Sequence, residues 1–290
     1  PRTMAVDAPP LGLVHRQSEN TTAVNQKTTP NPGFTGSEME LPGNEIHLYF
    51  AYPGEITEPG LLEQYASLLT DEDRELMSRF FYTRHRHLFL ITKALLRSCL
   101  SGYFQVEPAD WRFDKNNYGK PQIGFPKKSG PVRFNISHCD GLIMCGITRQ
   151  HDIGVDVEDA KRSTSASFES LSSYFSATET AEMAQLPADL QKQRFFDYWT
   201  LKESYIKARG MGLAIPLAKF SFRFAGDRLY SFETHPDLDD DATAWQFWRI
   251  SRDERYRIAV AVNSANQSFK FRAFNMVPLR KRDTIQLDFL

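Results

Sequence analysis

The chain has 290 residues, of which 41% are hydrophobic and 24% are charged, and its formal net charge at pH 7 is −1. This length is enough for one large domain or for two domains of about 100–150 residues each. Because the 35 basic and 36 acidic side chains nearly cancel, no overall field favours nucleic acid or an anionic membrane, and we expect neither as a partner.

Cysteine usage and the N-terminal sequence bear on the compartment. The three cysteines, Cys99, Cys139 and Cys145, show no repeated spacing, which favours a reducing compartment over a disulfide scaffold. No apolar signal segment follows a basic start, and no apolar run reaches the length of a membrane span. We therefore predict a cytoplasmic protein.

Residues 1–43 are rich in Thr, Pro, Asn and Ser, and they predict an N-terminal extension that is either flexible or laid over the folded body. A first lobe is predicted over residues 44–150. It begins with a strand over 45–52 and a helix over 60–69, and continues with one long helix over 72–100 whose caps are Thr70 and Asp71. Short strands follow over 111–114, 132–137, 142–148 and 153–158, separated by Gly, Asn and Asp turns.

The second half repeats the order of helices and strands, which predicts a second lobe over residues 151–290. The segment SATE at 176–179 is a capping box, and a longer helix over about 190–209 ends at Gly210. Strands are predicted over 219–225, 245–251 and 256–262, whereas residues 279–290 receive no assignment. The pattern predicts an α+β fold of two pseudo-duplicated lobes, with the active site in the cleft between them.

Two acidic side chains end the strand GVDVE at residues 154–158. Side chains two positions apart on a strand point to the same face, about 6.5–7 Å apart, so Asp156 and Glu158 project together while Val155 and Val157 face the core. Such a pair could bind one Mg²⁺. The alternative reading is a pair of solvated acids at an exposed strand end.

The predicted helix at 190–209 adds a third carboxylate. Trp199, Glu203 and Lys207 lie at i, i+4 and i+8 and therefore on one helical face. A Glu–Lys pair at this spacing is also common on exposed helix surfaces, where it contributes only about 0.2–0.5 kcal/mol. Because this pair shares its face with a large aromatic side chain, we favour a functional role.

A Ser-His pair lies in the segment RFNISHCDG at residues 133–141. Asn135, Ser137 and His138 stand at a strand end beside a turn, where hydroxyl, imidazole and backbone N–H groups can hold a phosphate. A purely structural histidine is the competing interpretation. Adjacent residues on a strand point to opposite faces, which argues against a Ser-His hydrolase.

Basic side chains gather in two further segments, residues 81–87 and 114–121. Either segment could be a solvated face. Together with three acids, they would supply the counter-cations that a metal-bound polyphosphate needs. The side chains are Arg84, His85, Arg86 and His87 in the first segment and Lys115 and Lys120 in the second.

On four motifs the chain resembles the 4′-phosphopantetheinyl transferases in their long, two-lobed, surfactin-synthetase-activating form. The motifs are GKP at 119–121, FNISH at 134–138, GVDVE at 154–158 and WTLKESYIKARGMGL at 199–213, and RFFYTRHRH at 79–87 is also similar. The resemblance implies transfer of 4′-phosphopantetheine from coenzyme A (CoA) to a serine of an apo acyl or peptidyl carrier protein, with release of 3′,5′-ADP. The partners it implies are carrier proteins of fatty-acid, polyketide and nonribosomal-peptide synthesis, and we expect a monomer.

The same resemblance implies roles for individual residues. Asp156, Glu158 and Glu203 would hold Mg²⁺, with Mn²⁺ as an alternative ion, and Glu203 or Glu158 would help to deprotonate the incoming serine. Lys207 would neutralise charge on the diphosphate and on the leaving group. The implied CoA contacts are Arg84, Lys115, Lys120, Asn135, Ser137, His138 and Lys207.

Two other functions remain open at this point. A metal-dependent phosphodiesterase acting on a nucleotide would use the same acids to activate water. A non-catalytic module that binds CoA or a carrier would keep the fold without the chemistry, but such a module has no need for three converging carboxylates and Lys207.

Overall fold

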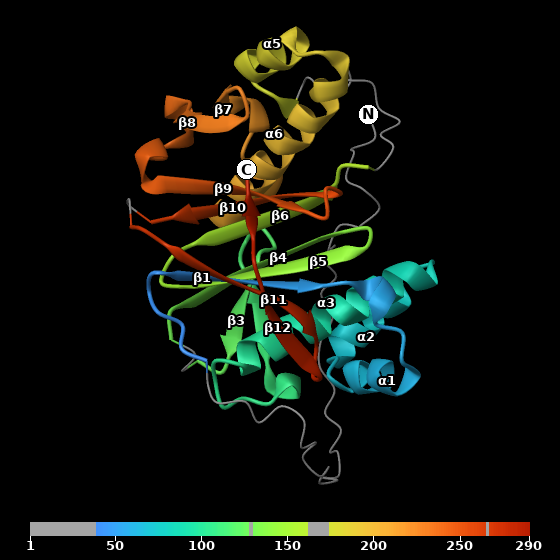
Figure 1. Cartoon of the computed structure of the whole chain (residues 1–290). Helices are drawn as coiled ribbons and strands as arrows, with labels where there is room; N and C mark the ends of the chain where they lie inside the picture. The colour runs from blue at the N-terminus through green and yellow to red at the C-terminus, as the bar shows by residue number, and fades with distance from the viewer. Residues whose placement is uncertain (1–38, 128–129, 162–173, 265–266) are drawn as a thin grey trace.

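The computed structural model describes residues 39–127, 130–161, 174–264 and 267–290, so most of the predicted extension lies outside it. Two β-sheets lie next to each other in the middle of the molecule (Figure 1). Helices α1–α3 cover the outer side of the first sheet, α6 covers the outer side of the second, and α5 packs on α6. The predicted α+β fold class is confirmed. None of the described helices combines the length and apolarity needed to cross a membrane.

The first sheet contains strands from both ends of the chain. Its order is β12-β11-β1-β5-β4, and β11 lies parallel to β1, with Ile46 opposite Phe271. Strands β11 and β12 fall in the segment that we predicted to belong to the second lobe, so the chain returns to the first sheet after building the second. The strands are β1 (Glu45–Ala51), β4 (Val132–Cys139), β5 (Leu142–Arg149), β11 (Lys270–Val277) and β12 (Lys281–Ile285); the separate hairpin is β2 (Arg112–Lys115) and β3 (Pro121–Phe125).

Three helices pack on this sheet: α1 (Pro59–Ser67), α2 (Asp71–Ser78) and α3 (Thr83–Ser101). Thr70 caps α2 as predicted, in a capping box with Asp73. The prediction of one helix over 72–100 is wrong, because Tyr82 is extended at φ −89° and ψ 134° and separates α2 from α3. At this break between the helices, called the elbow below, the ring of Phe80 packs against that of Phe89, with centroids 5.5 Å apart. The apolar spacing continues through the elbow, so it gave no sign of the break.

The second sheet has the order β13-β9-β10-β6. The capping box of Ser176 and Glu179 opens α5, and α6 ends at Gly210 in the left-handed conformation, both as predicted. The elements are β6 (Ile153–Asp159), β9 (Trp245–Arg252), β10 (Tyr256–Asn263), β13 (Asp288–Phe289), α5 (Ala177–Gln185), α6 (Ala188–Arg209) and the separate hairpin of β7 (Phe220–Ala225) and β8 (Arg228–Thr234). Short 3₁₀ helices lie at Pro53–Glu55, Pro108–Asp110, Gly212–Ala214, Leu217–Lys219, Pro236–Leu238 and Ala242–Ala244.

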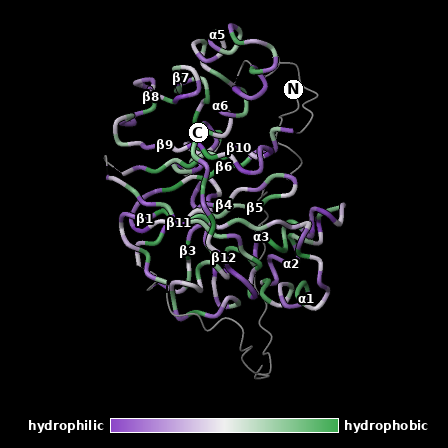
Figure 2. Tube along the Cα trace, in the orientation of Figure 1, coloured by the Kyte–Doolittle hydropathy of each residue, from purple (hydrophilic) through white to green (hydrophobic). Residues whose placement is uncertain are grey.

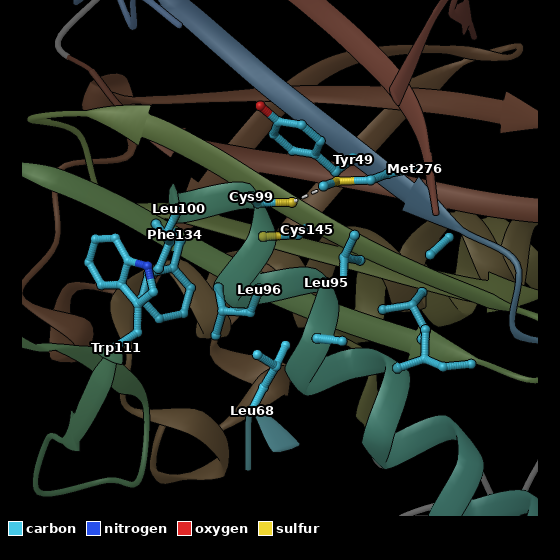
Figure 3. Packing of buried hydrophobic residues seen from close by; sticks show 14 of the residues in the cluster. Tyr49, Leu68, Leu95, Leu96, Cys99, Leu100, Trp111, Phe134, Cys145 and Met276 are labelled. Atoms are coloured by element: carbon cyan, nitrogen blue, oxygen red, sulfur yellow. Dashed lines mark hydrogen bonds between the residues drawn. The ribbon is translucent and has the colours of Figure 1, made fainter. Parts of the chain in front are cut away.

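Apolar side chains fill the space between and outside the sheets. Between the sheets, Ile46 and Leu48 of β1 pack in one cluster with Val155 and Val157 of β6, which confirms that these valines face the core. A second group of side chains, here called the first core cluster because it joins the first sheet to α1–α3, includes Trp111, Leu96 and Cys99, which pack together (Figure 3). A third surrounds α6. Hydrophobic segments accordingly gather in the centre of the molecule (Figure 2).

The last residues of the predicted extension, 39–43, lie within the described part of the chain. Leu41 is 7% exposed and belongs to the first core cluster. The backbone N–H of Met39 donates to the carbonyl of Gly102 at 2.8 Å. Of the two alternatives for the extension, these residues therefore follow the second, because they lie over the folded body.

Candidate active site

Two of the predicted motifs meet where β4 lies beside β6. The side-chain carbonyl of Asn135 accepts a hydrogen bond from the backbone N–H of Val155 at 2.8 Å. Two residues further along, the hydroxyl of Ser137 lies 3.0 Å from Oδ1 of Asp156 and donates to it. FNISH thus supplies the strand that supports GVDVE. The side chain of Asn135 links β4 to β6. Its contact with CoA stays a prediction.

Helix α6 crosses β6 at very short range. A Cβ on Gly154 would lie 1.9 Å from the carbonyl oxygen of Ser204 and 2.4 Å from the backbone nitrogen of Ala208, distances that no side chain permits. The absence of a side chain at Gly154 therefore lets the helix lie directly on the strand. This approach sets the positions of the functional side chains on the two elements.

Lys207 reaches from α6 to the acids of β6. Its Nζ lies 2.5 Å from Oδ1 of Asp156 and 3.0 Å from Oγ of Ser137. Burial disfavours the ammonium, but the negative charges of Asp156, Glu203 and Glu158 together outweigh this effect and raise the pKa of Lys207. Lys207 is therefore a cation at neutral pH, held by a carboxylate that is only 3% exposed.

The other two residues of the predicted helical face also turn toward β6. The indole N–H of Trp199 donates to Oε1 of Glu158 at 3.1 Å. Burial, and then the charge of Asp156, raise the pKa of Glu203 to about 7, although Lys207 opposes the shift. A carboxyl group with this pKa can exchange a proton near neutral pH.

One carboxylate oxygen of Asp156 is available to a cation. Oδ2 of Asp156 is buried and has no hydrogen-bond partner among the described residues. A buried carboxylate oxygen is seldom left without a partner, and a bound cation would satisfy it. In the described part of the chain, no three His, Cys, Asp or Glu side chains already stand in metal-binding geometry. The predicted ligands Asp156, Glu158 and Glu203 are all carboxylates, a type of ligand that suits Mg²⁺.

His138 follows Ser137 at the end of β4. Its side chain has an exposed edge, yet the surrounding protein excludes enough water to lower the pKa of His138 to about 4. The charge of Lys207 and a smaller contribution from His85 act in the same direction. The imidazole is therefore neutral at physiological pH. The influence of His85 also shows that the start of α3 lies close enough to act on this residue.

The other basic residues that were predicted to contact CoA have differing surroundings. Arg84 is exposed and its guanidinium lies 5.3 Å from the centroid of the Tyr82 ring. Lys115 is exposed on β2. Lys120 is partly buried, and its Nζ donates to the carbonyls of Ala208 at 2.9 Å and Ile153 at 3.3 Å. The predicted contacts of these three residues with CoA stay predictions.

Comparison with known proteins decides the family. The family described as "4′-phosphopantetheinyl transferase, N-terminal" matches residues 58–147, and the "4′-phosphopantetheinyl transferase superfamily" matches residues 152–261. The 4′-phosphopantetheinyl transferase HetI of Nostoc sp. is 32% identical over 80% of this chain and 94% of its own length. The 4′-phosphopantetheinyl transferase Sfp of Bacillus subtilis is 33% identical over 68% of this chain and 84% of its own. The chain belongs to the 4′-phosphopantetheinyl transferase superfamily.

The superfamily assignment confirms the resemblance that four motifs indicated, including the long, Sfp-like form. The protein is therefore an enzyme of this transferase class. The two matched regions separate between residues 147 and 152, at the turn that joins β5 to β6. FNISH lies near the end of the first region of the transferase, and GVDVE lies at the start of the second.

Sequence reasoning missed one polar residue of the transferase that contacts α6. The side-chain amide of Asn116 donates to the carbonyl of Gly210 at 2.7 Å, immediately after the end of the helix. The signal available was an asparagine in the turn KNNYGKP, which predicted a tight turn but not the surface on which the turn lies.

Proposed function

We propose that this transferase moves 4′-phosphopantetheine from CoA to a serine of an apo carrier protein in a Mg²⁺-dependent reaction that releases 3′,5′-ADP. The observation that carries the proposal is the buried carboxylate of Asp156. One of its oxygens is paired with Lys207, and the other has no hydrogen-bond partner among the described residues. A Xenopus laevis relative, 24% identical, is named L-aminoadipate-semialdehyde dehydrogenase-phosphopantetheinyl transferase, which supports a carrier within a larger enzyme as one kind of acceptor.

The acids supply the metal site in this proposal. Asp156, Glu158 and Glu203 would hold Mg²⁺ or, alternatively, Mn²⁺. When bound, the ion would neutralise part of the diphosphate charge of CoA. The indole N–H of Trp199 donates to Glu158 and so helps to orient its carboxylate.

The transfer step then follows from the positions of two α6 side chains. The serine Oγ forms a bond to the β-phosphorus of CoA, and the bond from that phosphorus to the bridging oxygen breaks, so that 3′,5′-ADP leaves with the electron pair. Glu203 would help to take up the serine proton. Glu158 is the second candidate for this role. Lys207 is cationic and stabilises the charge that grows on the bridging oxygen.

CoA would be held by neutral donors and by cations around the acids. His138 is neutral and can donate one ring N–H to a phosphate oxygen, beside the hydroxyl of Ser137. Arg84 and Lys115 are exposed cations that would meet the nucleotide and its 3′-phosphate. The carrier would be an acyl carrier protein or a carrier domain of a polyketide or nonribosomal-peptide synthase, and the enzyme would act as a monomer.

Mass spectrometry of the acceptor tests the proposal. An apo carrier protein is incubated with CoA, Mg²⁺ and the enzyme, and its serine should gain the mass of phosphopantetheine. Omission of Mg²⁺ with chelator present should stop the reaction. Turnover of CoA in the absence of carrier would favour the phosphodiesterase, and CoA binding without any turnover would favour the non-catalytic module.

A further inference from the structure

We propose that Asn116 and Lys120, in the turn between β2 and β3, are positioning residues: they clamp the last turn of α6 and thereby hold Lys207 on Asp156. The clamp joins a hairpin near the first sheet to the helix that carries Glu203 and Lys207.

Three hydrogen bonds make the clamp. The amide of Asn116 donates to the carbonyl of Gly210, and the ammonium of Lys120 donates to the carbonyl of Ala208. Lys120 also reaches the carbonyl of Ile153, the first residue of β6. The side-chain oxygen of Asn116 accepts from the backbone N–H groups of Tyr118 and Lys120, both at 2.9 Å, which fixes the shape of the turn.

The end of a helix needs such partners, because its last carbonyls have no N–H groups within the helix to bind them. A cation is also favoured there, since the helix dipole places negative partial charge at the C-terminus. Gly210 lets the turn approach closely. A Cβ at this left-handed position, φ +67°, would lie 2.8 Å from Cδ of Lys120 and 3.0 Å from Nδ2 of Asn116.

The clamp lies next to the catalytic contact. Ala208, whose carbonyl Lys120 binds, directly follows Lys207. The same residue packs on Gly154, where α6 comes closest to β6. If the last turn of the helix frays, Lys207 is within the turn that moves, whereas Trp199 lies more than two turns away. The clamp therefore acts on the position of Lys207 more than on the rest of the helix.

The surroundings of Lys120 fit this role better than they fit a phosphate ligand. Two of its three ammonium donors already bind carbonyls. Burial lowers the pKa of Lys120 to about 8, with Asp152 opposing this shift and Arg133 adding to it.

Hydrogen exchange of α6, followed by mass spectrometry, tests the clamp without any substrate. In Lys120→Met and Asn116→Ala, peptides ending near residue 210 should exchange about tenfold faster, as expected when one hydrogen bond of about 1.4 kcal/mol is lost. Peptides from the start of α6 should not change. Asn116→Asp keeps the acceptor for the turn and removes the donor to Gly210, so it should loosen the helix end without disrupting the turn.

Steady-state kinetics of transfer provides the second test. This kinetic test rests on the proposed function, whereas the hydrogen-exchange test does not. Both variants should lower kcat by about 10- to 100-fold, the loss expected when a reacting group is misplaced by about 1 Å. The KM for CoA should change little, and Lys120→Arg should restore most of kcat. Lys127→Met, an exposed charge beyond β3, should change neither readout. Leu68→Ala, in the first core, should lower Tm but not kcat.

Two results would overturn the proposal. One is a raised KM for CoA in Lys120→Met with unchanged exchange at the end of α6, which would make Lys120 a CoA ligand. The other is an Asn116→Ala variant that matches the wild type in exchange and kcat. If no variant or wild type modified a carrier at all, the proposed function would fail, while the exchange result would still decide whether the clamp exists.

Discussion

Nζ of Lys207 lies 2.5 Å from Oδ1 of Asp156, across the contact between α6 and β6. The side chain of Asp156 is 4% exposed and that of Lys207 is 28% exposed. The carboxylate is therefore buried, whereas part of the lysine side chain reaches solvent. An ammonium in this position can turn toward a substrate while its partner stays fixed. Because the pair is partly buried, removal of either member leaves a charge without compensation.

We expect Asp156→Ala to abolish transfer while the protein remains folded. The substitution removes the buried carboxylate and leaves too little negative charge to hold Mg²⁺. Transfer rate against Mg²⁺ concentration, measured beside a thermal melt, checks this. Retained Mg²⁺-dependent transfer in this variant would contradict the assignment of the site. Glu203→Gln should be severe, and Glu158→Gln milder if water replaces that ligand.

We expect Lys207→Ala to lower the rate of transfer more than it weakens the binding of Mg²⁺. Loss of one electrostatic group of this kind commonly lowers turnover by about 10²–10³, or roughly 3–4 kcal/mol. An exposed i, i+4 partner of Glu203 would contribute only about 0.5 kcal/mol to helix stability. The measurement is the rate of carrier modification at saturating Mg²⁺ and CoA. An unchanged rate with a slightly lower Tm would show that Lys207 only stabilises the helix surface and does not take part in transfer.

Stability should fall as the pH drops below about 6.5, in part because of His47. This buried ring bonds the Tyr103 hydroxyl at 2.6 Å and Glu45 at 2.8 Å. Burial lowers the pKa of His47, although Glu45 opposes the shift. The unfolded chain therefore binds the proton at higher pH than the folded chain, and the free energy of unfolding decreases by at most about 1.4 kcal/mol per pH unit for this group.

Urea unfolding of His47→Gln at pH 7 and pH 5 checks this expectation. The variant should show a smaller loss of stability between the two pH values than the wild type. The matched control is His235→Gln, because that side chain is 53% exposed and lies outside the core. Equal pH dependence in wild type and His47→Gln would exclude His47 as a source.

Deletion of residues 1–38 should leave transfer to a small carrier protein largely intact, since this segment contains no residue assigned to the site. Deletion of residues 1–43 should in addition lower stability. It removes Leu41 from the first core, and complete burial of such a side chain contributes about 1.5–3 kcal/mol. Paired melts and transfer rates of the two truncations check this. Leu41→Ala in the full chain should reproduce the loss of stability, and a large loss of turnover in the shorter truncation would contradict the prediction.

The parts of the site that lie within one element could be predicted from the sequence. The two-residue period of GVDVE placed Asp156 and Glu158 on one face, and the helical period placed Trp199 and Lys207 on another. Contacts between elements could not be predicted in the same way. The position of Ser137 under Lys207 depends on how β4 lies beside β6, and the carbonyls that bind Lys120 belong to residues far away in the chain.

The same limit explains the missed strands. Charged and apolar side chains alternate only in part along β11. The strand is stabilised by pairing with β1, in which Ile46 lies opposite Phe271, 225 positions later in the chain. The helix break at Tyr82 was missed for a related reason, because Phe80 packs on Phe89 and so keeps the apolar spacing of a continuous helix. Local patterns report which side chains are buried, but they do not report the element that buries them.

The parallel pairing of β11 with β1 has a consequence for the synthesis of the protein. Strand β1 emerges from the ribosome early, but one of its two neighbours in the sheet is made only after residue 270. Until then, β1 has an unpaired edge, a surface that favours aggregation. An isolated fragment ending near residue 150 would therefore keep that edge. Fragments of this enzyme should become stable only when the last strands are supplied, for example as a separate peptide that complements the fragment.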